Sequence, residues 1–118
     1  IICSYEQRFK MTYQLVKDDT APQVKATLTR DDTGAAIDCS GGTVRMYFRA
    51  KGGSSILFTL TAADAGTDLA NGIAIFGFSG SNLDQSEGYY EGEIEITYSD
   101  GTVETIFEVL DFYIRADF

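Results

Sequence analysis

The sequence predicts an all-β fold, an antiparallel sandwich of about seven strands. The chain is rich in glycine, tyrosine and phenylalanine, with 12, 7 and 8 copies, and has one proline and no tryptophan. This composition is typical of strands joined by tight turns. Short segments of alternating apolar and polar residues are separated by turns that contain glycine or aspartate, a pattern that favours a sandwich over a helical fold. With 118 residues the chain fits one domain with one core.

A hairpin near the C-terminus is the clearest single element. From Tyr90 to Tyr98 the even positions hold Tyr, Gly or Ile and the odd positions hold Glu or Thr, so one face of this strand is expected to be buried. Asp100-Gly101 can supply the positive φ angles of a two-residue turn. Such a turn places Tyr98 opposite Val103 and brings Phe107 to the buried face, so that apolar residues mostly meet one another.

Earlier segments repeat the alternation. In residues 43–49, apolar residues alternate with Arg45, Tyr47 and Arg49, which predicts a half-buried strand. Further strands are expected at residues 11–16, 24–29, 56–61 and 73–78.

The two ends of the chain depart from this simple pattern. Beyond Val109 the apolar positions shift by one residue, which predicts a β-bulge at residues 109–111 and a long, bent last strand. Met11 heads the first predicted strand, so residues 11–118 are expected to form the single domain. Residues 1–10 are set apart as an N-terminal extension to which no role is assigned.

Charge and hydropathy exclude several classes of partner. The net charge is −9 and the sequence pI is about 4.2, so the overall field repels phosphate backbones and anionic lipid surfaces. No apolar run approaches the length of a membrane helix, and the N-terminus lacks the layout of a signal peptide. We expect a protein without a signal peptide that binds neither nucleic acid nor membrane.

The residues offer little material for catalysis. The chain has no histidine, which the usual nucleophilic triads and zinc sites require, and no phosphate-binding glycine loop. Glu91, Glu93 and Glu95 line one strand face and could supply the carboxylate pair of a glycosidase, but a flat face offers no cleft between two carboxyl groups. We therefore interpret them as a solvated face that discourages edge pairing, and expect no enzyme activity, no catalytic residue, no cofactor and no metal site.

Some side chains have alternative interpretations. Exposed Tyr47, Tyr89 and Ile106 could form a contact surface together with the three glutamates, because aromatic side chains bring large contact areas; alternatively a second sheet buries some of them. Aspartates in the predicted loops could bind calcium, although aspartate is also the ordinary turn residue. Cys3 and Cys39 could form one disulfide, but free thiols are favoured because a single pair is no disulfide framework.

A local pattern makes the predicted sandwich immunoglobulin-like. Asp84, Gly88 and Tyr90 lie at the start of a predicted strand. This pattern is similar to the tyrosine corner of immunoglobulin-like domains, where a tyrosine hydroxyl forms a hydrogen bond to the backbone of the preceding loop. Gly92 stands two residues after this tyrosine, where antibody domains have a cysteine, and tryptophan is missing. The domain is therefore not of the antibody type.

From about Thr12 to Ile114 the chain resembles the immunoglobulin-like N-terminal domain of phage baseplate upper proteins. The most distinctive piece is Ile-Asp-x-Ser-Gly-x-Thr-Val at residues 37–44, in which Cys39 replaces the leucine-like residue that the family usually has. The segments that carry the resemblance are residues 19–24, 28–34, 37–49, 88–93 and 98–103.

The resemblance implies a structural role and no family catalytic residue. It implies a phage or prophage tail or baseplate protein, located in the virion, that docks onto other tail proteins, usually in symmetric rings or multimers. A homo-oligomer is among the assemblies that it implies. The alternative, drawn from the tyrosines and acidic loops, is a carbohydrate-binding or adhesin-like sandwich, which the missing tryptophan weakens.

Overall fold

The protein is an all-β sandwich, and a computed structural model describes its residues 3–5, 12–30, 32–63 and 67–117. Within these residues the chain forms nine strands and one short 3₁₀ helix, Leu69–Asn71. The strands are β1 Cys3–Tyr5, β2 Thr12–Val16, β3 Gln23–Arg30, β4 Thr43–Ala50, β5 Phe58–Thr61, β6 Ile73–Gly77, β7 Gly88–Thr97, β8 Val103–Thr105 and β9 Leu110–Arg115.

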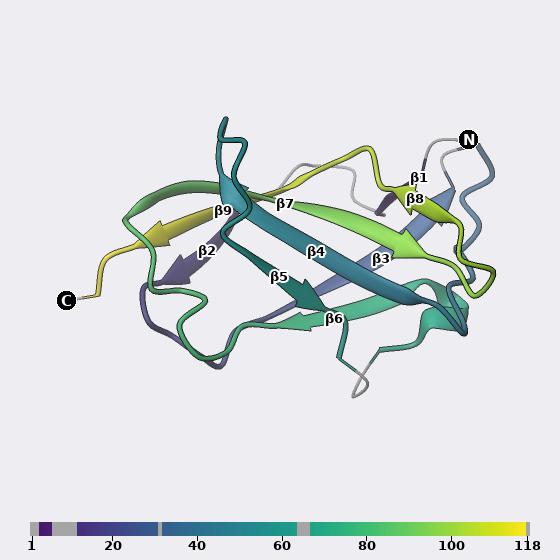
Figure 1. Ribbon diagram of the computed structural model, residues 1–118, viewed down its shortest axis with the longest axis horizontal. Coiled ribbons are helices and arrows are strands. Elements are labelled where there is room, and N and C mark those ends of the chain that lie inside the picture. The colour runs from purple at the N-terminus through teal and green to yellow at the C-terminus, as the bar shows by residue number, and fades with distance from the viewer. Residues whose placement is uncertain (1–2, 6–11, 31, 64–66, 118) are drawn as a thin grey trace.

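The strands are arranged in two layers. One sheet has the order β1-β3-β6, and the other has the order β2-β9-β7-β4-β5 with β8 beside β7. Figure 1 shows β7, β4 and β5 in front of β3 and β6. The predicted all-β sandwich is thus confirmed, with two more strands than expected: β1 comes from the segment assigned to the N-terminal extension, and the last predicted strand is divided into β8 and β9.

One pairing departs from the expected antiparallel arrangement. β2 runs parallel to β9, with Tyr13 opposite Phe112 and Leu15 opposite Ile114. No hairpin connects these strands, because after Val16 the chain crosses to β3 in the other sheet. A hairpin would force β2 and β9 to be antiparallel; since none joins them, the two strands can pair in parallel.

Phe48 lies at the centre of an aromatic core. Its ring packs against Phe58, Tyr90 and Phe112 at centroid distances of 4.5, 5.4 and 5.1 Å. It also meets Phe78 in a T-shaped arrangement, at a centroid distance of 6.0 Å. These side chains come from five strands or their ends, so the core joins both layers.

The alternation predicted for β3, β4 and β7 places their alternate apolar residues in this interior. β6, predicted from a continuous apolar run, buries Ala74 and Phe76 and leaves Ile73 and Ile75 half-buried.

The corner at the start of β7 has the expected tyrosine. Tyr90 is buried among the core rings, and its hydroxyl donates a hydrogen bond to the backbone oxygen of Ser86, four residues earlier. Two residues after Tyr90, Gly92 leaves room for Met46 and Phe112, since a Cβ at Gly92 would lie 2.5 Å from the Met46 sulfur.

The predicted register of the C-terminal hairpin is wrong by one residue. Val103 pairs with Thr97 rather than with Tyr98, because the loop contains three residues, Ser99–Gly101, instead of two. The Tyr98 amide donates to the Thr102 oxygen, and Gly101 takes a φ of 88° at the last loop position, as in three-residue hairpin loops. A shift of one residue moves each side chain of the second strand to the other face.

The bulge lies earlier than predicted and is larger. Thr105 pairs with Glu95 and Leu110 pairs with Gly92, so the four residues 106–109 face only Glu93 and Ile94. These extra residues separate β8 from β9 and restore the apolar face of β9 to the core, where Leu110, Phe112 and Ile114 are fully buried.

Candidate interaction surface

The outer face of β4 and β7 carries alternating opposite charges. Arg45 lies directly opposite Glu95, and Arg49 lies directly opposite Glu91. The Arg49 Nε atom is 3.3 Å from a carboxylate oxygen of Glu91, which also accepts a hydrogen bond from the Gly52 amide. Glu91 and Glu95 are therefore half-buried partners of β4 residues rather than a free acidic face, a detail that the strand pattern alone did not reveal.

Tyr47 belongs to the same face, with Glu93 opposite it in β7. The Tyr47 hydroxyl donates a hydrogen bond of 3.0 Å to Glu95, and this bond raises the pKa of the hydroxyl above its usual value. The ring is half-buried. Tyr47 thus helps to hold the glutamates in place and offers only part of its ring to a partner.

Tyr89 lies apart from this group, near the β9 side of the sheet. Its ring is 59% exposed and meets Tyr113 edge-on, at a centroid distance of 4.8 Å. The Tyr113 hydroxyl donates a hydrogen bond of 2.7 Å to Glu87. The predicted surface residues Tyr47, Tyr89 and the three glutamates therefore lie on one sheet face, but Tyr89 is grouped with Tyr113 and not with Tyr47.

Ile106 is not a surface residue. The interpretation of it as exposed is wrong, because its side chain is 1% exposed, whereas Phe107 is 78% exposed and Val103 is 58% exposed. The cause is the three-residue hairpin loop, which turns Glu104 and Ile106 inward and Val103, Thr105 and Phe107 outward. The sequence Ser-Asp-Gly-Thr is compatible with a three-residue loop as well as a two-residue one. The local sequence therefore permits the observed register but does not select it.

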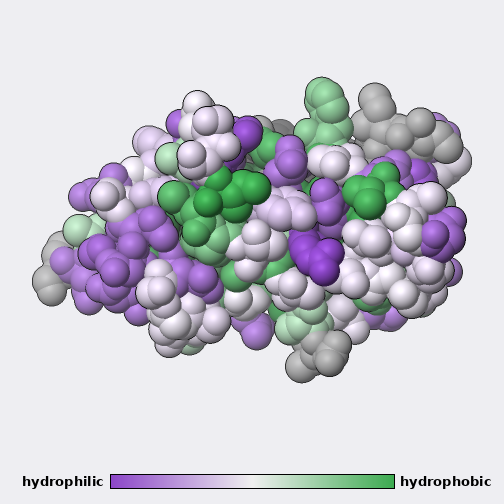
Figure 2. Space-filling model, in the orientation of Figure 1, coloured by the Kyte–Doolittle hydropathy of each residue, from purple (hydrophilic) through white to green (hydrophobic). Residues whose placement is uncertain are grey.

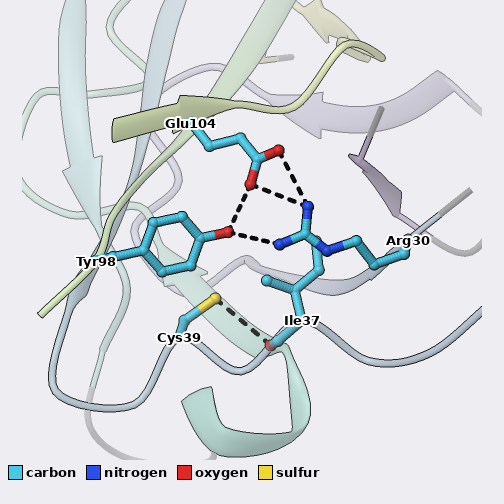
Figure 3. A network of polar contacts seen from close by, with 5 residues as sticks. All are labelled: Arg30, Ile37, Cys39, Tyr98 and Glu104. Atoms are coloured by element: carbon cyan, nitrogen blue, oxygen red, sulfur yellow. Dashed lines mark hydrogen bonds and ion pairs between the residues drawn. The ribbon is translucent and has the colours of Figure 1, made fainter. Parts of the chain in front are cut away.

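The inward side of β8 carries a polar network that joins the two sheets (Figure 3). Both Glu104 carboxylate oxygens accept hydrogen bonds from Nη1 of Arg30 in β3, at 3.3 and 3.2 Å. The Tyr98 hydroxyl donates a hydrogen bond of 2.6 Å to Glu104 and accepts one of 3.3 Å from Arg30. No local pattern in the sequence predicts this network, because Arg30 and Glu104 are distant from each other in the chain.

Cys39 lies close to this network but forms no disulfide. Its thiol is free and fully buried, and its sulfur lies 3.6 Å from the Ile37 backbone oxygen (Figure 3). Burial, with a smaller contribution from the charge of Asp38, raises the pKa of this thiol to about 11. The preference for a free thiol at this position is confirmed; for Cys3 the structure describes only the backbone.

The described side chains form no convergent polar pocket. A shallow cavity of about 380 Å³ lies over β2 and β9 and is lined by Gln14, Leu15, Val16, Tyr113 and Arg115, none of which is a carboxylate. No group of three or more acidic or cysteine side chains in the described part of the chain is placed to hold a metal ion.

Exposed apolar side chains form two separate areas on the face seen in Figure 2. One lies over β8 and the loop after it and contains Val103 and Phe107; the other lies just before β5 and contains Ile56 and Leu57, which are 57% and 44% exposed. The first area is hereafter the β8 patch and the second the β5 patch. Large apolar side chains exposed in this way are the usual material of contact surfaces.

Comparisons with known proteins place the chain in no family. A scan against models of known protein families finds none that matches, and a search of curated proteins finds no significant match. No helix among the described residues is long and apolar enough to cross a membrane. The fold and the surface define the chain as a β-sandwich domain with an ion-paired outer face and two exposed apolar patches.

Proposed function

We propose that this protein is a structural docking module of a phage or prophage tail or baseplate, which acts in the virion through contacts with other tail proteins. The observation that carries the docking role is the exposure of Val103 on β8 and of Phe107 in the bend just after it, while Glu104 anchors the inner side of β8. The phage setting rests on the resemblance of residues 37–44 and the flanking segments to the immunoglobulin-like domain of baseplate upper proteins.

The rigidity of the patch supports this proposal. A contact surface binds more tightly when its residues are held in the binding conformation beforehand. Ion pairs and hydrogen bonds tie β4 to β7 and β8 to β3, so both apolar patches stand on a fixed framework. Residues with large exposed apolar area on a fixed framework suit an assembly role.

The test combines the neighbouring genes with the purified protein. We expect tail or baseplate genes beside the gene of this chain, and we expect the product of one of them to co-elute with the chain in a fixed ratio. A photo-reactive phenylalanine analogue at position 107 should crosslink to that product, and one at the exposed Lys51 serves as a control. A strictly monomeric protein that binds none of the neighbouring gene products would refute the docking role.

A carbohydrate-binding role is the second candidate, favoured by the cavity over β2 and β9. Tyr113, Gln14 and Arg115 line it, which supplies one ring face and several hydrogen-bonding groups, and Tyr89 packs beside Tyr113. A glycan array, read with and without calcium, tests this candidate. Binding lost in Tyr113→Ala and kept in Tyr47→Phe would support it; an array without hits would remove it.

A further inference from the structure

On its outer edge β8 has backbone N–H and C=O groups that form hydrogen bonds with no other described strand. The Tyr98 amide donates to Thr102, and the Ile106 amide donates to Ile94, so the even-numbered residues of this segment face β7. Because backbone groups alternate between the two sides of an antiparallel strand, those of Val103 and Thr105 point away from β7. Phe107 lies two residues past the end of β8, in a bend. β8 pairs only with β7 among the described strands, so within the described part of the chain no strand pairs with its other side.

The same three residues direct their side chains to the outer face. Val103 and Phe107 are 58% and 78% exposed, and Thr105 between them is also exposed. Edge strands are usually protected by short length, a bulge, charges or proline. β8 is three residues long and is followed by the bulge at residues 106–109, but its outward row of Val103, Thr105 and Phe107 contains neither a charge nor a proline. Glu104 faces inward and is held by Arg30 and Tyr98, so the edge is fixed in position before any partner arrives.

The charges near the edge define the partner. Glu95 lies directly opposite Thr105 in β7, Glu93 faces the bulge, and the exposed Glu108 follows Phe107. Arg45, the cation directly opposite Glu95, lies in β4, on the far side of β7 from β8. A second copy of this chain, with its net charge of −9, would bring the same acidic groups to the contact. Charge complementarity therefore favours a basic partner over a second copy.

We propose that β8 accepts an extended segment of a different protein as an added edge strand, with apolar side chains beside Val103 and Phe107 and a lysine or arginine between them. Strands lie about 4.8 Å apart, so a long basic side chain that crosses over Thr105 reaches the carboxylate of Glu95. The main-chain bonds supply affinity, and the side-chain row supplies selectivity. This inference rests on the proposed docking function and assigns it a surface and a partner chemistry.

The test uses the acetylated and amidated peptide Ser-Val-Thr-Arg-Thr-Val-Ser and the ¹⁵N-labelled protein. We expect saturable shifts of the Val103, Thr105 and Phe107 amides in NMR spectra, and slower hydrogen exchange at these amides. The same peptide with glutamate in place of arginine should bind about tenfold more weakly or not at all. Shifts centred elsewhere, equal binding of the two peptides, or no binding would overturn the proposal.

Matched variants distinguish peptide binding at the β8 edge from nonspecific hydrophobic binding. Thr105→Pro removes an outward amide without touching the bonds to β7, so it should abolish peptide binding while the spectrum of the remaining protein stays folded; Thr105→Ala keeps the amide and should bind like the wild type. Val103→Ser should weaken binding about tenfold, whereas Ile56→Ser, at an equally exposed site of the β5 patch, should leave it unchanged.

Failure of this inference can be distinguished from failure of the docking function. If a tail protein binds the chain and Thr105→Pro and Val103→Ser bind it as tightly as the wild type, the docking function stands and the β8 edge is excluded. If the chain binds no neighbouring gene product at all, the docking function fails. Binding of the peptide with the expected effects of the variants supports the β8 edge in either case.

Discussion

Arg30 and Glu104 join the two sheets of the sandwich, with the guanidinium Nη1 at 3.3 and 3.2 Å from the two carboxylate oxygens. Their side chains are 28% and 25% exposed, so water screens the pair only in part. The pair lies on the inner side of β8, opposite to the outward-facing Val103 and Thr105. The contribution of the pair to stability can therefore be measured without changing the exposed side chains.

A double-mutant cycle should detect an interaction free energy between Arg30 and Glu104. Glu104→Gln should lower the free energy of unfolding by about 1–2 kcal/mol, because it removes the charge from a partly buried group that accepts hydrogen bonds from Arg30 Nη1 and the Tyr98 hydroxyl, while keeping the shape. Arg30→Gln should cost a similar amount, and the double variant should cost less than both together, since each single change already breaks the pair. Urea unfolding of the four proteins measures this; strict additivity would show that the contact contributes nothing.

Core packing around Gly92 should tolerate no added methyl group. A Cβ at this position would meet the Met46 sulfur at 2.5 Å and a ring carbon of Phe112 at 3.0 Å, so Gly92→Ala should destabilise the fold by about 1–3 kcal/mol. Gly77→Ala is the matched glycine control, because Gly77 has no positive φ and a Cβ there would come no closer than 4.0 Å to its neighbour, the Cγ atom of Gln23. Thermal unfolding ranks the two variants; an effect at Gly92 no larger than that at Gly77 would contradict the crowding argument.

Phe48 should be the most costly single truncation among the aromatic residues. It is fully buried and packs against Phe58, Phe78, Tyr90 and Phe112. Phe48→Ala should lower the free energy of unfolding by about 3–5 kcal/mol, through lost burial and the cavity that remains. Phe107→Ala removes the same ring from an exposed site and should change stability by less than about 0.5 kcal/mol. Equal losses in the two variants would contradict the assigned burial.

The Cys39 thiol should be inert in the folded protein. Burial raises its pKa to about 11, and the thiolate is the reactive form. In a Cys3→Ser variant, which leaves Cys39 as the single thiol, a disulfide reagent at pH 8 should label the native protein at least about a hundredfold more slowly than the protein in denaturant. Rapid native labelling would show that the site opens.

The hairpin loop should respond to acid through Asp100. Its carboxylate accepts hydrogen bonds from the Thr102 hydroxyl at 2.6 Å and the Thr102 amide at 3.0 Å, which lower the pKa of Asp100 below 3.8. Because the folded pKa is lowered, the ionised carboxylate stabilises the loop at neutral pH, and this stabilisation is lost as the pH falls through the folded value. Carboxyl ¹³C NMR titration should show the low pKa, and Thr102→Val should raise it toward the usual value. An unchanged pKa in that variant would contradict the role of the hydroxyl.

Local alternation in the sequence determined the class of fold and most of the strands. The apolar residues of β3, β4 and β7 repeat every second position, and this period identifies both a strand and its buried face without knowledge of any neighbour. The tyrosine at position 90 was identifiable for the same reason, because its hydrogen bond to Ser86 spans only four residues. In β6 the apolar residues are consecutive, so its sequence identifies the strand but not the buried face.

Only the tertiary structure decided what the last third of the chain presents to solvent. Asp100-Gly101 is compatible with two loop lengths, and the difference of one residue exchanges Ile106 for Phe107 at the surface. The choice depends on contacts between distant residues: Glu104 meets Arg30 across the sandwich, and Ile106 joins the core. Local sequence cannot contain that information, since the free energy that selects the register comes from burial and pairing between segments about 70 residues apart.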